Sequence, residues 1–351
     1  KVPTASNIDD MIADEKKRLQ EQNQRKILTE MIQQQARRDI IAEKMISAIQ
    51  ALPELKIEPL KINLKHKYSE VEAVLMLSDI QAGTYISSET TGGLNEYNKD
   101  ILAKQFKVLK YAICSLVTKM KLISPIRKLN IHALGDMVEG MGIFVGQAQH
   151  TDQDLYNQMF FLAEQICKLL VELLGLFDEI EFTGVGGNHG RIGKKGENPH
   201  WVNWDVYLYK YLEARLQNYK RIKFNIPLSW WYLDTIQGHN FLLLHGDDIK
   251  AWNGLPYYGI DRADAKWTKL LNSKNLRYDY IELGHFHQPT ELPSVAGEKF
   301  INGCWPGGSI FALKNLVTAN RPVQKFFVVH PEKGAIWRNP IWLDFFEDVE
   351  G

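Results

Sequence analysis

The sequence predicts an α/β protein with four α/β/β/α layers, in which two packed sheets form the core and helices lie outside. Between residues 71 and 219, apolar strand-like runs alternate with longer helix-like segments, which is typical of α/β units. Beyond Arg221 the pattern changes to short strands separated by turn residues. Several apolar runs end in residue types that bind metals, and strand ends are where α/β proteins assemble their sites.

The composition limits the class of protein. Of the 351 residues 45% are hydrophobic, which is enough for one large domain with an appendage. Lys plus Arg number 42, as do Asp plus Glu, so the formal net charge is zero and any polyanion site must be a local patch. The cysteines Cys114, Cys167 and Cys304 are scattered in apolar contexts, which predicts reduced core thiols of a cytosolic protein. Apolar stretches are too short and too charged to span a bilayer and no signal peptide is recognisable, so we expect a cytoplasmic protein without membrane contact.

Residues 1–60 are predicted to form a helical extension and a linker. Residues 1–52 contain no glycine and are rich in helix-forming residues, with apolar side chains recurring at a spacing that favours one or two long amphipathic helices. The helix could pack on its own domain or self-associate through its apolar stripe, and the sequence leaves both open. Candidate helix caps are Thr4, Ser6 and Asn7, and the linker is marked by Pro53 and Pro59.

The main domain begins with alternating strands and helices. Apolar runs predict the strands, and 3.6-residue periodicity with capping residues predicts the helices. The predicted elements are a strand over 71–77, a helix over 98–121, a strand over 129–134, a helix capped by Thr151 or Asp152 and running to about residue 177, a strand over 180–185 and a helix over 207–219.

The second half of the domain reads mostly as strands and turns. Residues 237–240 are predicted to form a hairpin turn, and one more helix is expected at 261–271. The predicted strands are 222–225, 230–235, 240–244, 278–283, 299–302, 309–313, 324–330 and 335–343.

Asp136 is the centre of the predicted site. The run from Leu129 to Leu134 leads into Gly135 and Asp136, which places this carboxylate at the carboxyl end of a buried strand. Four other apolar runs end in comparable motifs: Ser78-Asp79-Ile80-Gln81, Gly187-Asn188-His189-Gly190, His245-Gly246-Asp247 and Gly284-His285-Phe286-His287. A single Gly-Asp is a common turn, but five strand ends carrying metal-ligand residue types indicate one site. Histidines outside these motifs, His66, His132, His239 and His330, are interpreted as ordinary surface or core residues.

In this order the motifs resemble those of the calcineurin-like metallophosphoesterase superfamily, and most closely its Mre11/SbcD-like nuclease branch, which phages and bacteria carry. The resemblance covers about residues 70–345. It implies a four-layer metallophosphoesterase sandwich, with the catalytic domain over residues 61–351.

The resemblance also implies two divalent metal ions. We expect Mn²⁺, with Fe, Zn²⁺ or Mg²⁺ as alternatives. Two ions about 3.5–4 Å apart can clamp a phosphate and ionise a bridging water for in-line attack. The implied ligands are Asp136 as the bridge, Asp79, Gln81 and His287 for the first ion, and Asn188, His245 and His285 for the second. His189 would stabilise the transition-state charge or protonate the leaving oxygen. Glu139 and Asp247 would orient histidines from outside the ligand set.

Gln81 departs from the family pattern, which has histidine at this position. A Gln carbonyl oxygen binds Mn²⁺ or Mg²⁺ but holds transition metals more weakly than imidazole does. Three interpretations remain open: an active enzyme with a labile, Mn²⁺-preferring first site, a site working with one metal, and a degenerate binding module.

The substrate is the least specified part of the prediction. The candidate substrate-binding residues are Arg191, Lys194, Lys195, His150 and Trp201. Cations beside an aromatic surface suit single-stranded or frayed nucleic acid, although Trp201 and Trp204 could equally be core anchors.

Together with the resemblance, these observations predict a metal-dependent phosphodiesterase, and more specifically a DNA nuclease, in the cytoplasm of a bacterium or a phage-infected host. Because the chain stops soon after the catalytic domain, at Gly351, we expect a stand-alone enzyme without an obligate ATPase partner. The alternatives are a phosphodiesterase for small molecules such as cyclic nucleotides, a phosphomonoesterase, and a nucleic-acid-binding scaffold with a structural metal site.

Overall fold

The computed structural model describes residues 5–50, 69–144, 146–250, 256–294, 297–308 and 320–349. The chain divides into two compact units, Lys1–Lys65 and His66–Gly351. The predicted linker prolines Pro53 and Pro59, His66, the candidate cap Thr4 and the predicted strand 309–313 lie outside the described residues.

The first unit contains one continuous helix, α1, over Ala5–Gln50. Ser6 and Asn7 lie inside this helix, so their prediction as caps is wrong. The side chains from Met11 to Lys44 are all exposed, including the large apolar ones. Several of these apolar residues are adjacent pairs such as Ile27 and Leu28, which point about 100° apart around a helix. The apolar stripe is therefore broad, and self-association through it stays a prediction.

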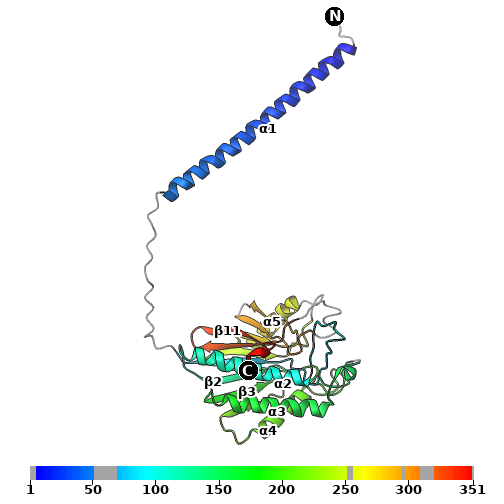
Figure 1. Ribbon diagram of the computed structural model, residues 1–351, viewed down its shortest axis with the longest axis vertical. Helices are drawn as coiled ribbons and strands as arrows, with labels where there is room; N and C mark the ends of the chain where they lie inside the picture. Colours follow the sequence, from blue (N-terminus) through cyan, green and yellow to red (C-terminus); the bar gives the residue numbers. More distant parts are fainter. Residues whose placement is uncertain are drawn as a thin grey trace. The chain divides into compact units, whose positions relative to one another are not determined.

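The second unit is built on two mixed sheets (Figure 1). Sheet 1 has the order β11-β10-β1-β2-β3-β4, in which β1 to β4 are parallel and β10 and β11 are antiparallel additions. Its strands are β1 Val71–Leu77, β2 Ile126–Ala133, β3 Glu179–Gly184, β4 Ile222–Asn225, β10 Val323–His330 and β11 Gly334–Trp342.

Sheet 2 has the order β5-β6-β7-β9-β8, with β6, β7 and β9 parallel. Its strands are β5 Trp231–Ile236, β6 His239–Leu244, β7 Tyr280–Leu283, β8 Thr290–Pro293 and β9 Glu298–Ile301. Gln237 and Gly238 form the predicted hairpin turn between β5 and β6, both with positive φ. Strand β8 was not predicted, because Thr290-Glu291-Leu292-Pro293 is short and ends in proline.

Helices cover the outer face of each sheet, as predicted. They are α2 Lys99–Met120, α3 Leu155–Leu173 and α4 Trp204–Arg215 on sheet 1, and α5 Tyr257–Asn272 on sheet 2. A separate apolar cluster that includes Val74, Phe241 and Phe327 lies between the sheets. These three apolar layers confirm the α/β/β/α arrangement. No helix in the described ranges combines the length and apolar character needed to cross a membrane.

The helix ends differ from the predicted ones in ways that capping explains. Helix α3 is capped by Asp154, whose side chain accepts from the Asn157 N–H, and neither Thr151 nor Asp152 caps it. Helix α4 begins three residues earlier than predicted because Asn203 caps it and accepts from the Asp205 N–H. Two short 3₁₀ turns, Gln147–His150 and Phe346–Asp348, were not predicted.

His132 pairs with two carboxylates inside the sandwich. Its Nδ1 lies 2.8 Å from Glu282 Oε2 and its Nε2 lies 3.0 Å from Asp234 Oδ2. The side chains of His132 and Glu282 are fully buried. Burial alone would lower the pKa of His132, but the charges of Glu282 and Asp234 outweigh it and raise that pKa to about 10. His132 is thus a buried cation that joins β2 to β7 and β5.

We expect this ion triad to make stability pH-dependent. A histidine pKa raised from 6.5 to about 10 adds stability that is complete below pH 6.5 and is lost as the pH rises towards 10. His132→Gln should lower the free energy of unfolding by about 3 kcal/mol near pH 6.5, because a buried carboxylate loses its partner. Urea unfolding at pH 6.5 and 9.5 measures this, with His239→Gln as the control. A difference between wild type and His132→Gln that does not change with pH would contradict the charged triad.

Candidate metal centre

The candidate site lies where the carboxyl ends of strands from both sheets meet. Strands β1, β2 and β3 run parallel in sheet 1, and β6 and β7 run parallel in sheet 2. The loops that follow them are joined directly: the Asp79 N–H donates to Gly135 O at 3.0 Å, and the His285 N–H donates to Asp79 Oδ1 at 3.0 Å. The five sequence motifs are therefore brought to one place.

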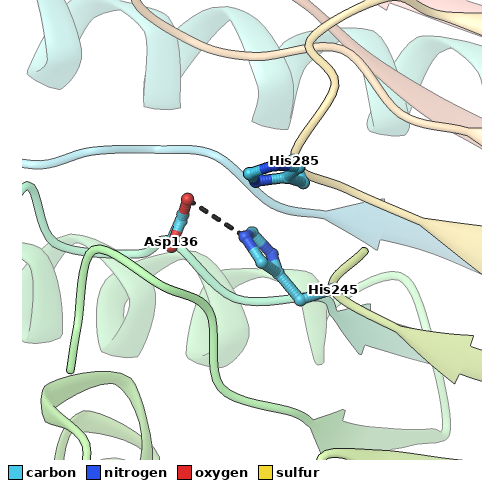
Figure 2. Close-up of side chains that lie close together, drawn as sticks. All are labelled: Asp136, His245 and His285. Carbon is cyan, nitrogen blue, oxygen red and sulfur yellow. Dashed lines mark ion pairs between the residues drawn. The ribbon is translucent and has the colours of Figure 1, made fainter. Parts of the chain in front are cut away.

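Asp136, His245 and His285 form the closest cluster. One possible ligand atom from each lies within 4.8 Å of the others. Figure 2 shows the three side chains pointing towards one another from three different loops, with Asp136 Oδ2 3.1 Å from His245 Nε2. A carboxylate and two imidazoles form a donor set that suits Mn²⁺, Fe or Zn²⁺.

His245 is held in the orientation that a metal ligand needs. Its Nδ1 lies 2.7 Å from Leu134 O, and only a protonated nitrogen can donate to a carbonyl. Its Nε2 consequently faces Asp136 and Asn188, whose Oδ1 lies 3.0 Å away. A backbone carbonyl that fixes one imidazole nitrogen and leaves the other free is typical of metal-binding histidines.

The first predicted ligand group also assembles. His287 Nε2 lies 3.2 Å from Asp79 Oδ1, and the Gln81 side-chain amide lies 3.5 Å from the Nε2 atoms of both His287 and His189. Gln81 thus stands between the first ligand group and His189, and its own role as a ligand stays a prediction.

His189 is fixed through its backbone and through one ring nitrogen. Its backbone N–H donates to Asp136 Oδ1 at 2.7 Å, and its Nδ1 lies 3.0 Å from Glu139 O and 3.2 Å from Glu139 Oε2. The carboxylate of Glu139 in turn accepts from Thr84 and Gln147. The His189 Nε2 therefore points towards Asp136, 4.0 Å from its Oδ2.

The charges of this cluster are strongly coupled. Burial would raise the pKa of Asp136, but the adjacent His245 and His189 hold it below its usual range. Burial would lower the pKa of His189, but Asp136 and Glu139 raise it to about 9, which favours the protonated imidazole. Burial and the neighbouring His245 lower the pKa of His285 to about 4, whereas the charge of Asp136 outweighs burial at His245 and raises its pKa to about 10.

The ligand loops have an unusual backbone. Five of the eight non-glycine residues with positive φ in the described chain are candidate ligands, namely Asp79, Gln81, Asp136, His285 and His287. Side chains other than glycine rarely adopt this conformation, and it gathers at functional sites. Asp and His adopt it more often than most other side chains, but no sequence motif identifies it, because most Asp and His residues have negative φ.

The sequence analysis missed Asp205, which holds two of the loops together. Its fully buried carboxylate accepts the N–H groups of Asp136 at 2.9 Å, Met137 at 3.0 Å and Gly187 at 2.8 Å. Asp205 lies in the first turn of α4, two residues after its cap Asn203. An Asn-x-Asp sequence at a helix start was the available signal, but Asn98-Lys99-Asp100 begins α2 in the same way and Asp100 is exposed.

A second hydrogen-bond network, which the sequence did not predict, holds Asp79 in place. Ser78 Oγ donates to Asp79 Oδ2 at 2.6 Å and accepts from Asn302 Nδ2 at 3.0 Å. Gln324 Oε1 accepts from Asn302 Nδ2 and from the Ser78 N–H, both at 2.9 Å. These buried side chains come from the residue after β1, from β10 and from the loop after β9, so sequence spacing gave no sign of their contact.

The predicted substrate-binding residues differ in their exposure and in their hydrogen bonds. Arg191 Nε donates to Asn188 O at 3.0 Å, while its buried Nη1 has no hydrogen-bond partner in the part of the chain that the structure describes. Lys194 and His150 are exposed, and 44% of Trp201 is exposed, so Trp201 is not a core anchor. Trp204 instead packs edge-on against Tyr156 and Tyr207.

Lys195 and Asp247 are paired with each other. Lys195 Nζ lies 3.4 Å from Asp247 Oδ2 and 2.9 Å from Asp248 Oδ1. Across the described ranges, Asp247 forms no hydrogen bond with a histidine. Glu139, by contrast, contacts the His189 ring as the orienting role requires.

Comparisons with known proteins give distant structural likenesses only. No family model matches the sequence, and no curated protein matches it. An archaeal phosphodiesterase is similar at 11% identity, over 77% of this chain and 99% of that one, with a TM-score of 0.33. A hypothetical protein from Pyrococcus horikoshii is similar at 12% identity over 79% and 91%, with a TM-score of 0.38. Vps29 from Entamoeba histolytica, in complex with Zn²⁺, is similar at 12% identity over 78% and 99%, with a TM-score of 0.31.

We expect Asp205→Asn to disorganise the ligand loops. The amide turns an NH₂ group towards N–H donors, so stability at pH 8 should fall by about 2 kcal/mol and Mn²⁺ affinity by about 10–100-fold. Asp100→Asn is the matched control and should stay within about 0.5 kcal/mol. Urea unfolding and calorimetric Mn²⁺ titration measure both, and equal effects of the two substitutions would refute the role of Asp205.

We expect Gln81→His to tighten the first metal site. Histidine tolerates the positive φ of 47° found at this position, and its imidazole holds transition metals more firmly than an amide oxygen does. Calorimetric titration should show a lower Mn²⁺ dissociation constant for Gln81→His and a higher one for Gln81→Leu. Unchanged binding in both variants would mean that Gln81 is not a ligand.

Proposed function

We propose that the protein is a metal-dependent phosphodiesterase, and more specifically a DNA nuclease of the Mre11/SbcD-like kind from a bacterium or phage. The observation that carries the proposal is the convergence of Asp136, His245 and His285 within 4.8 Å, with His189 Nε2 4.0 Å from Asp136 Oδ2. Two divalent ions bound here, Mn²⁺ by preference, would supply an ionised water and neutralise charge on the phosphate.

Residues of the chain would bind the two ions and donate a proton. Asp136, held by Asp205 and His189, sits at the centre of the ligand set and would bridge the two ions. Asp79 and His287, which contact each other, would hold one ion, and Asn188, His245 and His285 would hold the other. His189 directs its Nε2 to the same space and would donate a proton or hydrogen bond to the phosphate or the leaving oxygen.

Arg191 supports a phosphate-bearing substrate. Its Nε is tied to Asn188 O, next to a metal ligand, while its buried Nη1 has no partner among the described residues. An unsatisfied guanidinium nitrogen in a buried position is costly, and a substrate phosphate would satisfy it. Lys194, His150 and Trp201 remain candidate contacts on the rim.

The decisive experiment uses metal-stripped protein with Mn²⁺ added back in steps. Labelled single-stranded and double-stranded DNA are assayed beside bis-p-nitrophenyl phosphate. Mn²⁺-dependent cleavage of DNA establishes the nuclease, and cleavage of the small ester alone points to a small-molecule phosphodiesterase. If neither is cut while Mn²⁺ still binds, the metal site is structural and the proposal fails.

Asp136→Asn and His189→Ala test the assignment of roles. We expect Asp136→Asn to abolish hydrolysis, because the bridging carboxylate is lost. His189→Ala should lower kcat by about 10²–10⁴-fold, the range for a lost proton donor, with Mn²⁺ binding retained. His239→Ala, outside the motifs, should leave kcat unchanged. Substantial activity in Asp136→Asn, with its fold intact by circular dichroism, would overturn the assignment.

A further inference from the structure

Phe144 occupies a position that core packing does not explain. It lies in the loop between β2 and α3, and its ring centroid is 5.0 Å from that of His189, with the ring planes at 53°. The side chain is 44% exposed, and the nearby Met141 is 40% exposed. An aromatic ring beside the candidate proton donor therefore presents much of its surface to whatever enters the site.

The loop holds Phe144 in place. Gln147, which is buried, accepts the backbone N–H of Ile143 at 2.9 Å and that of Phe144 at 3.3 Å through its Oε1. The Nε2 of the same side chain donates to Glu139 O at 2.6 Å. Since Glu139 also contacts the His189 ring, the backbone of Phe144 is tied to the group that orients His189. The ring is thus pre-positioned rather than free on a loop tip.

Charge and aromatic surface are presented together at this site. The buried Arg191 Nη1 offers a donor for a phosphate oxygen, and the metal ligands mark the place of the scissile phosphate. Phe144 adds an aromatic face beside His189. Phosphate contacts combined with a stacking surface are how proteins bind single-stranded nucleic acid without reading its sequence.

We propose that Phe144 is a stacking platform for the nucleobase next to the scissile phosphate, which makes the substrate a single-stranded nucleic acid or a strand end. The inference rests on the proposed phosphodiesterase and names its substrate class. Stacking requires an unpaired base, because a base inside a duplex has its faces covered by its neighbours.

Binding, rather than turnover, tests the proposal. The affinities of a labelled single-stranded oligonucleotide and of an abasic strand of equal length are compared by fluorescence anisotropy, with Ca²⁺ replacing Mn²⁺ to prevent cleavage. Wild-type protein should prefer the base-bearing strand by roughly tenfold, which is within the range for stacking one base on an aromatic side chain. Phe144→Leu should lose most of this preference, and Phe144→Trp should keep it.

Phe160→Leu is the matched control. Phe160 is also 44% exposed, but it lies on α3 and packs against Tyr211 of α4. An unchanged preference in Phe144→Leu overturns the proposal, as does the absence of any preference in the wild type. Equal weakening for both strands also overturns it, because that result indicates a structural role. Phe144→Trp keeps the test valid if Phe144→Leu unfolds.

The two proposals can fail separately. Hydrolysis of bis-p-nitrophenyl phosphate that needs Asp136, without any base preference, leaves the phosphodiesterase standing and removes the stacking platform. A base preference lost in Phe144→Leu, without hydrolysis of any ester, removes the phosphodiesterase and leaves a nucleic-acid-binding site.

Discussion

The bond between the His245 ring and Leu134 O is the link on which the site depends. It joins the end of β6 in sheet 2 to the end of β2 in sheet 1, and 2.7 Å separate His245 Nδ1 from Leu134 O. Because Leu134 stands two residues before Asp136, this bond also sets where the imidazole meets the carboxylate. This contact and the buried His132 pairs fix how the strands of the two sheets meet.

Much of this arrangement was predictable from the order of apolar and ligand residues along the sequence. The runs before Asp79, Asp136 and His245 are mostly apolar, and a buried strand that ends in a ligand residue type can be recognised without any structure. Most strands and helices lie where periodicity places them, since long apolar patterns dominate local preference. The errors are at helix ends, where one capping side chain, such as Asp154 or Asn203, decides the boundary.

The rest of the site depends on contacts that sequence spacing does not encode. Asp205 and Asp100 occupy equivalent positions in two helices, yet only Asp205 is buried against the ligand loops. Lys195 looked like a free cation, but Asp247 and Asp248 reach it from about fifty positions away. Phe144 was not predicted as a site residue, because a single aromatic residue in a glycine-containing loop is common. Only the structure shows that its ring contacts His189.

The pairing of Lys195 with two aspartates has a consequence for ionic strength. A protein that neutralises many phosphates releases many counterions, so its affinity for nucleic acid falls steeply as salt is added. Of the three cations that follow His189, only Arg191 and Lys194 are not paired with acidic groups in the described chain, and the net charge of the whole sequence is zero. With two such contacts, the logarithm of affinity would fall with a slope of only about −1.4 to −1.8 against the logarithm of salt concentration. As the proposed nuclease, such a protein would lose about 25- to 60-fold in affinity for each tenfold rise in salt, far less than a protein with six to ten phosphate contacts. It would find its substrate by short-range contact rather than by long-range attraction.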